Sequence, residues 1–169
     1  MRLHSAKLPQ VASEMVSALM AQKAIESEQP REVELDVQSV LAQYVRDEQD
    51  VADRARDLAT ARGLPPGELG RLKRLAADER GIKVGDEAID YLLDQLVEIL
   101  MHSTHVDEVF AEDVDLRRIM RTPLRKQATE EENLINEVRG RLKHVQEGTS
   151  LWEVEYRRMM DDVRRRKGL

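Results

Sequence analysis

The sequence predicts an all-α protein in which two related helical units pack into a compact multi-helix bundle. Apolar residues make up 41% of the 169 residues and aromatic residues only 3%, a composition that suits helix packing better than a β-rich sandwich or barrel. The apolar residues recur at the spacing of amphipathic helices. One such pattern occurs twice, 81 residues apart, which indicates the two units.

The repeated pattern belongs to the first helical stretch of the chain. Its apolar positions and their counterparts are Leu8/Ile89, Val11/Leu92, Ala12/Leu93, Met15/Leu96, Val16/Val97, Leu19/Leu100 and Met20/Met101. Because two amphipathic helices fall into phase by chance about once in four alignments, the hypothesis depends on further matches. These are Val33/Val114, Leu35/Leu116 and Gly67/Gly148 and, after a three-residue slip, Lys73-Arg74/Arg157-Arg158 and Asp78/Asp162. We therefore predict an internal duplication, with units at residues 1–82 and 83–169.

Three helical stretches are expected in the first unit, over residues 5–24, 30–63 and 66–81. Ser5 is expected to cap the first stretch, and Pro30 suits the first turn of the second. The charged run at residues 46–50 predicts a bend or break within the second stretch. Gly63 and Gly81 are typical residues for the ends of the second and third stretches.

The second unit is expected to open with the most strongly patterned helix, which Asp86 would cap. Its wide apolar stripe predicts an element that is covered on more than one side. Pro123 predicts an interruption of the following helix, and a further helix is expected to end at Gly148. Ser150 and Glu153 form a capping box for the last helix, whose apolar stripe is Trp152, Tyr156, Met159, Met160 and Val163. No glycine-rich linker separates the units, so we expect them to pack together.

Composition and charge exclude several classes of function. The chain has 27 basic and 33 acidic residues, a net charge of −6, which argues against attraction of the whole surface to nucleic acid or anionic lipid. There is no cysteine, which excludes disulfides and thiolate-ligated metals. The chain starts without a secretory leader and has no apolar run of membrane-spanning length. A cytoplasmic protein that does not enter membranes is expected.

Two arginine-rich segments are candidate nucleic-acid contacts, Arg117, Arg118, Arg121 and Arg125 in one and Arg164, Arg165 and Arg166 in the other. In the last helix, acidic residues lie four positions before arginines, as Asp161 does before Arg165, which favours ion pairs on the helix surface. The first segment has only Phe110 nearby and lacks the interleaved aromatic residues that stack on bases. A solvated helix face is the favoured interpretation, with nucleic-acid binding as the alternative function.

Metal-binding and catalytic motifs are sparse. His102 and His105 have a spacing that can share a metal, but a helix end near Ser103 would separate them and no further ligand motif completes a site. No nucleophile elbow, phosphate-binding loop or dinucleotide-binding glycine pattern occurs. We therefore predict no metal, no cofactor, no catalytic residue and no enzymatic activity.

Trp152 and Tyr156 are the candidate anchors of a partner surface, with Arg157 and Arg158 as its polar rim. The alternative is that both rings are buried in the core of the second unit. Solvent exposure of the two rings distinguishes these interpretations. An unidentified protein partner is predicted, and the sequence leaves the oligomeric state open.

The segment from Gln146 to Arg158, QEGTSLWEVEYRR, resembles the ending of an uncharacterised bacterial family catalogued as domain of unknown function 507. The opening Met1-Arg2-Leu3 with Lys7, and Val33, Val37 and Val40 with the acidic stretch at residues 47–53, are also similar to that family. The resemblance implies a small helical protein of the bacterial cytosol, in single or tandem units, and no reaction. Where the second unit has its Trp152 segment, the first has Gly67-Glu68-Leu69-Gly70-Arg71-Leu72. The predicted function is therefore that of a non-catalytic helical interaction or scaffold protein.

Overall fold

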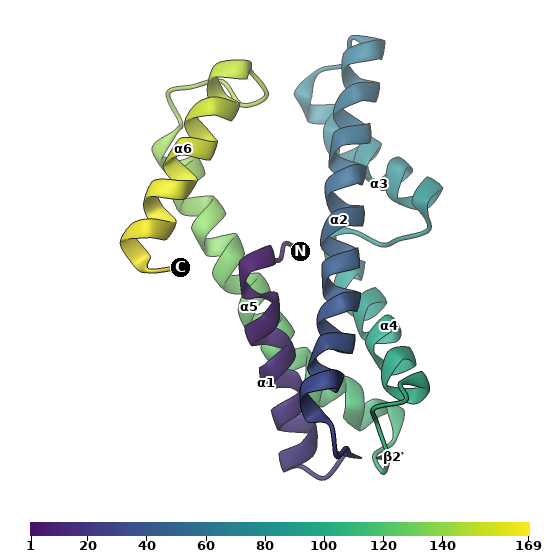
Figure 1. Cartoon of the computed structure of the whole chain (residues 1–169). Coiled ribbons are helices and arrows are strands. Elements are labelled where there is room, and N and C mark those ends of the chain that lie inside the picture. Colours follow the sequence, from purple (N-terminus) through teal and green to yellow (C-terminus); the bar gives the residue numbers. More distant parts are fainter.

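The computed structural model describes residues 1–169 and consists of six α-helices with one very short sheet (Figure 1). The helices are α1 (Leu8–Ala21), α2 (Pro30–Arg62), α3 (Leu69–Arg80), α4 (Ala88–His102), α5 (Asp113–Arg141) and α6 (Ser150–Lys167). The strands β1 (Ile25–Glu26) and β2 (Glu108–Val109) pair antiparallel and tie the α1–α2 connection to the α4–α5 connection. The all-α prediction is confirmed.

The helices form a bundle from which two arms extend (Figure 1). In the bundle, α1 packs against α2 and α5, and α4 packs against the same two helices. Beyond the bundle, α2 and α5 each continue into an arm, where α3 packs on α2 and α6 packs on α5. The main core holds 27 buried residues from both halves of the chain, and a second cluster of six lies between α5 and α6. The two halves therefore share one core, as expected, and α4 is covered on two sides.

Each half contains a short helix, a two-residue strand, a long helix and a final helix in the same order. The two long helices also bury equivalent positions. The seven buried residues of α2, each advanced by 83 positions, all coincide with buried residues of α5: Val33/Leu116, Val37/Met120, Leu41/Leu124, Tyr44/Gln127, Val51/Leu134, Ala52/Ile135 and Ala55/Val138. The long helices therefore present the same face to their surroundings. The sequence matches Val33/Val114 and Leu35/Leu116 are wrong, because one residue of each pair is buried and the other, Val114 or Leu35, is 69% or 50% exposed.

The bend or break predicted at residues 46–50 is wrong, because α2 is continuous over 33 residues. Arg46, Gln49 and Asp50 of this run are exposed, whereas Glu48 lies on the buried stripe of the helix. Asp47 accepts a hydrogen bond from Gln43 at 3.0 Å and another from Arg80 of α3 at 2.8 Å. The buried stripe meanwhile continues past the charged run to Val51, so packing holds both sides of it in one helix.

The interruption predicted at Pro123 is also wrong, because α5 runs through this residue, which is buried inside the helix. A proline in a helix interior removes one hydrogen bond and costs about 3 kcal/mol. Leu116, Met120 and Leu124 on the same helix are 0% exposed in the main core. Burial of such side chains contributes about 2 kcal/mol each, so tertiary packing outweighs the local cost.

Helix ends were predicted with mixed success. Gly63 and Gly81 adopt left-handed backbone conformations, with φ of 60° and 77°, and end α2 and α3 as predicted. Neither Ser5 nor Asp86 caps a helix with its side chain, because 3₁₀ turns precede α1 and α4 and their backbone carbonyls accept the first N–H groups instead. Helix α5 ends at Arg141, before the predicted end at Gly148.

The start of α6 is shifted by one residue from the predicted capping box. Thr149, in extended conformation, accepts a hydrogen bond from the backbone N–H of Trp152 at 3.2 Å. The hydroxyl of Thr149 also donates to the carbonyl of Gln146 at 2.8 Å. Ser150 is therefore the first helical residue, and Glu153 has no capping role.

Candidate functional site

The solvent exposure of the aromatic residues of α6 is intermediate between the two alternatives that the sequence left open, exposed anchors and buried core residues. The rings of Trp152 and Tyr156 stack on each other, with centroids 4.7 Å apart and an interplanar angle of 18°. Both rings are half-buried against the small cluster between α5 and α6. Burial raises the pKa of Tyr156. The two rings are thus incompletely covered, neither enclosed in a core nor fully exposed.

The side of α6 that faces solvent carries further apolar residues. Leu151 and Val154 are 61% and 63% exposed. Spacings of three and four residues align both with Arg158 along one side of the helix. Arg158 is bonded to Glu155 at 2.6 Å, whereas Arg157 has no ion-pair partner. We call Leu151, Val154, Arg157 and Arg158 the α6 outer face.

The first arginine-rich segment is largely neutralised by aspartates. The pairs are Arg117 with Asp94 and Asp113 at 2.5 and 2.6 Å, Arg118 with Asp115 at 3.4 Å, and Arg121 with Asp90 at 2.7 Å. Arg125 is exposed and has no ion-pair partner. Three of the four charges are therefore already compensated.

The second arginine-rich segment is dispersed around α6. Arg164 points inward and pairs with Glu131 of α5, and both side chains are largely buried. Arg165 lies 3.9 Å from Asp162, and Arg166 is exposed without a partner. The structure does not gather these three arginines on one surface.

The two histidines of the H-x-x-H pair have different partners. Nδ1 of His102 lies 2.9 Å from the carbonyl oxygen of Glu98 within α4. Nδ1 of His105 lies 3.0 Å from Asp36 of α2, which also accepts a hydrogen bond from Ser103. No three potential ligands from among the His, Asp and Glu side chains are assembled into a cluster that could hold a metal.

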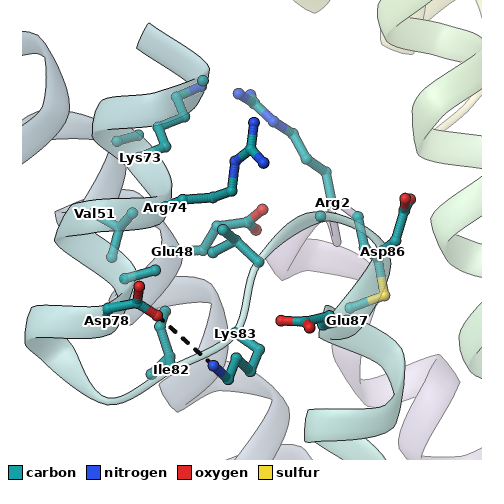
Figure 2. Close-up of a pocket in the computed structure, with 16 residues that line it drawn as sticks. Arg2, Glu48, Val51, Lys73, Arg74, Asp78, Ile82, Lys83, Asp86 and Glu87 are labelled. Atoms are coloured by element: carbon teal, nitrogen blue, oxygen red, sulfur yellow. Dashed lines mark ion pairs between the residues drawn. The ribbon is translucent and has the colours of Figure 1, made fainter.

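An open cavity of about 740 Å³ lies between α2, α3 and the connection from α3 to α4 (Figure 2). Arg2, from the segment before α1, and Lys73 and Arg74, from α3, extend their charged groups toward its mouth. Glu48 of α2 points into it. Its apolar lining residues are Met1, Val51, Ala52, Ala77, Ile82 and Val84. We call this volume the basic cavity.

The charges around the basic cavity are mostly unpaired. The one ion pair between its lining residues joins Lys83 and Asp78 at 3.7 Å (Figure 2). Arg2, Lys73 and Arg74 form no hydrogen bond and no ion pair through their side chains. Three cations therefore converge on one opening without the ion pairs that most arginines of this chain have, and Glu48 acts on Arg2 and Lys73 only at longer range.

Burial and neighbouring charges shift the pKa values of Lys73 and Glu48 in this cavity. Burial lowers the pKa of Lys73, and the positive charges of Arg2, Arg56 and Arg139 lower it further. Burial raises the pKa of Glu48, although Arg2 and Lys73 oppose that shift. Because Lys73 is half-buried among like charges, holding its positive charge there costs stability.

Arg56 and Arg139 belong to different arms, and the two arms meet at their tips. A Cβ atom on Gly148, between α5 and α6, would lie 3.4 Å from Cγ of Pro66. Arg56 of α2 lies 4.0 Å from Glu153 of α6. Both halves of the chain therefore contribute to the positive field around Lys73.

The basic cavity was not predicted from the sequence. In the sequence, Lys73 and Arg74 stood out only because they match Arg157 and Arg158 in the repeat. Glu48 stood out only as part of an acidic stretch. One signal was present: Glu48 follows Tyr44 by four residues and precedes Val51 by three, which places a carboxylate on the buried stripe of α2. A charged residue at such a position indicates a partner or a site.

The fold and these surfaces define an all-helical protein made of two similarly ordered halves that share a bundle. Over residues 1–169 the chain matches the family described as Protein of unknown function (DUF507). The chain belongs to this family, and the resemblance seen in the sequence is confirmed. No curated protein matches the chain. None of the helices combines the length and apolar character that crossing a membrane requires.

Proposed function

We propose that this protein is a non-catalytic helical interaction protein of the scaffold type, and that it binds a protein partner through the α6 outer face. The observation that carries the proposal is that Leu151 and Val154 are 61% and 63% exposed on the same helix whose other side carries the incompletely covered Trp152–Tyr156 stack. Trp, Tyr and Arg are the residue types that dominate binding energy at protein interfaces. A bacterial source and a cytosolic location are part of this proposal.

The unpaired charge on this surface favours an acidic partner. Arg157 has no ion-pair partner, and Arg166 at the far end of α6 is also unpaired and exposed. Complementary charge speeds association and selects among partners. The partner surface that fits the α6 outer face therefore combines an apolar patch with carboxylates.

A binding role is supported by the composition of the basic cavity. Its lining contains no histidine, serine, threonine or cysteine, so a nucleophile activated by a neighbouring base in the Ser–His or Cys–His manner does not occur there. Its charged groups are arginines, lysines and carboxylates, which suit recognition of a charged ligand.

Nucleic-acid binding is the second candidate, through Arg117, Arg118, Arg121 and Arg125. The aspartates that hold three of these arginines disfavour it. Fluorescence anisotropy of labelled DNA and RNA with micromolar protein at about 50 mM salt tests it. We expect no change, and a salt-sensitive signal lost in an Arg117→Gln, Arg121→Gln variant would favour nucleic acid instead.

We also propose that the two halves descend from one duplicated unit. Their elements follow the same order, and the buried positions of α2 and α5 coincide. This would make the family member a tandem form in which only the second unit keeps the aromatic segment.

The partner surface is tested with exposed residues, so that the core is left intact. A tagged Leu151→Ser, Val154→Ser variant is compared with the unchanged protein in capture from a native lysate, and Leu35→Ser, at a 50% exposed leucine of α2, is the control. We expect loss of the captured protein in the α6 variant only. Trp152 is the only tryptophan, so its fluorescence reports binding of the purified partner. Equal capture by all three proteins would contradict the assignment to α6.

A further inference from the structure

The two halves place a glutamate at equivalent positions of their long helices. The register that matches the buried residues of α2 and α5 pairs Glu48 with Glu131. The burial patterns of α3 and α6 agree when α3 is advanced by 87 positions, which pairs Leu72, Ala76 and Ala77 with Met159, Val163 and Arg164. This register replaces the 84-residue offset at which the sequence pairs Lys73-Arg74 with Arg157-Arg158. In the second half, Arg164 forms an ion pair with Glu131, and their side chains are 15% and 8% exposed. The first half has Ala77 where the second has this arginine.

The small side chain of Ala77 leaves space beside Glu48 that a larger residue would fill. Ala77 is buried and lines the cavity, and Glu48 points into it without a hydrogen bond or ion pair (Figure 2). The first half thus has an open polar volume at the place where the second half has an internal ion pair. A carboxylate that lacks a partner in such a volume lowers stability, and features that lower stability in this way are expected at functional sites.

The sign of the ligand follows from the charges at the mouth of the cavity. Arg2, Lys73 and Arg74 lack acidic partners there, and Figure 2 shows their charged groups on the same side of the opening. The lining also holds acidic residues away from this group: Asp78 is paired with Lys83, and Asp86 and Glu87 line another part of the wall, near the start of α4. Burial is the main reason why the pKa of Lys73 is lowered, and repulsion from Arg2 adds to it. An anion held between the three cations would relieve that repulsion.

Size and shape narrow the class of anion. Two guanidinium groups and one ammonium offer many donors, which suits phosphate, with its several acceptor oxygens and double negative charge, better than a single carboxylate. A cavity of about 740 Å³ lies within the usual range for small-molecule sites, roughly 300 to 1,000 Å³. None of the lining residues is aromatic, so the site lacks the stacking surface that a nucleobase uses.

We propose that the basic cavity binds the phosphate group of a small phosphorylated molecule, with Arg2, Lys73 and Arg74 as the residues that hold it. The site is separate from the α6 outer face and goes beyond the proposed function. Glu48 lies at the floor and limits how strongly the anion is held. Ala77 leaves the volume that the ligand occupies.

The first experiment measures binding to the full chain by isothermal titration calorimetry. The probes are inorganic phosphate and glycerol phosphate, with sodium chloride at equal ionic strength as the reference. We expect saturable binding of both phosphates, weakened at least tenfold by Lys73→Gln, Arg74→Gln. The control, Arg157→Gln, Arg158→Gln, removes the same charge from α6 and should bind as the unchanged protein does. Absence of saturable binding, or equal loss in both variants, would overturn the proposal.

Two further variants distinguish phosphate held inside the cavity from phosphate attracted to surface charge. Ala77→Arg installs the arginine of the second half, which should occupy the cavity, pair with Glu48 and abolish phosphate binding while circular dichroism shows a retained helical fold. Glu48→Gln removes a like charge and should tighten phosphate binding severalfold, which decides the question even where Ala77→Arg fails to fold.

The opposite results have definite meanings. Weaker phosphate binding by Glu48→Gln would indicate a ligand that places a cation against Glu48, and would overturn the assignment. Binding of a DNA oligonucleotide with the same dependence on Lys73 and Arg74, without binding of either phosphate, would overturn the small-molecule class. Because partner capture is measured at α6 and phosphate binding at the cavity, either proposal can fail without the other.

Discussion

Glu131 of α5 and Arg164 of α6 form an ion pair in which both side chains are largely withdrawn from water. A pair of this kind often contributes little net stability, because removing two charges from water offsets their attraction. Loss of only one partner is a different matter, since the remaining charge is left buried without compensation. Single and double variants of the pair should therefore differ in stability.

Arg164→Met is expected to lower the free energy of unfolding by about 3 kcal/mol, because it strands the carboxylate of Glu131. The double variant Glu131→Gln, Arg164→Met should lose much less. Urea unfolding followed by the fluorescence of Trp152, which lies in the same arm, measures both. A double variant as unstable as the single one would show that the pair's packing, and not its charge, matters.

Glu48→Gln is expected to stabilise the protein at pH 7. Burial raises the pKa of Glu48 in the folded state, so the folded chain binds this proton more tightly than the unfolded chain does. Stability due to this group therefore falls as pH rises through the ordinary range of glutamate and up to the folded pKa. The advantage of the glutamine variant should be present at pH 7 and shrink toward about pH 4. Urea midpoints at both pH values provide the measurement, and a less stable variant at pH 7 would contradict the sign.

Thr149→Ala is expected to destabilise α6 by about 1 kcal/mol, the usual cost of losing an N-cap. The cap bond to the N–H of Trp152 is 3.2 Å long. Ser150→Ala is the matched control, and it should change stability by only a few tenths of a kcal/mol because Ser150 has no capping bond. A larger effect at Ser150 would restore the capping box inferred from the sequence.

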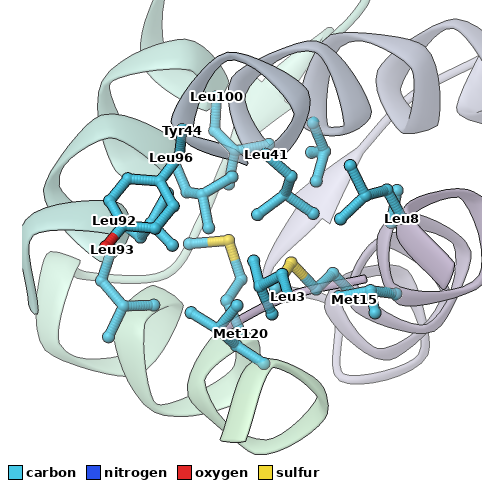
Figure 3. Close-up of a cluster of buried hydrophobic side chains, with 14 of the residues drawn as sticks. Leu3, Leu8, Met15, Leu41, Tyr44, Leu92, Leu93, Leu96, Leu100 and Met120 are labelled. Atoms are coloured by element: carbon cyan, nitrogen blue, oxygen red, sulfur yellow. The ribbon is translucent and has the colours of Figure 1, made fainter. Parts of the chain in front are cut away.

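Leu96→Ala is expected to cost about 3 kcal/mol, because it opens a cavity in a core that cannot fully collapse. Leu96 of α4 is 0% exposed in the cluster shared by both halves (Figure 3). Leu35→Ala, at a half-exposed leucine, should stay within about 0.5 kcal/mol of the unchanged protein. Thermal and urea unfolding of the two variants make the comparison, and similar losses would mean that the shared core is loosely packed.

The sequence was sufficient to predict the helices and most of the core, because apolar periodicity and the glycine ends are local signals. Leu92, Leu93 and Leu96 are buried as their stripe implied, and Gly63 and Gly81 end their helices. The errors occurred where distant contacts decide. Nothing local reveals that Arg80 of α3 pairs with Asp47, or that buried residues on both sides of the charged run keep α2 continuous.

The candidate sites were less predictable for the same reason. Trp152 and Tyr156 stood out by residue type, and only their burial had to be seen. The basic cavity joins Arg2, Glu48 and Lys73 from three distant segments, and no spacing rule connects them. The role of Ala77 could be inferred only by comparison with Arg164, because Ala77 matters through its small size at a position where the second half has an arginine.

The crossed packing of the bundle has a consequence for how the chain can be divided. Helix α1 lies against α5 and α2 lies against α4, so each half completes the other's interior. If the two halves, residues 1–82 and 83–169, were produced as separate polypeptides, each would expose a broad apolar surface to water. Each should then precipitate or self-associate. Mixed together from denaturant, they should reconstitute the native molecule as complementary fragments.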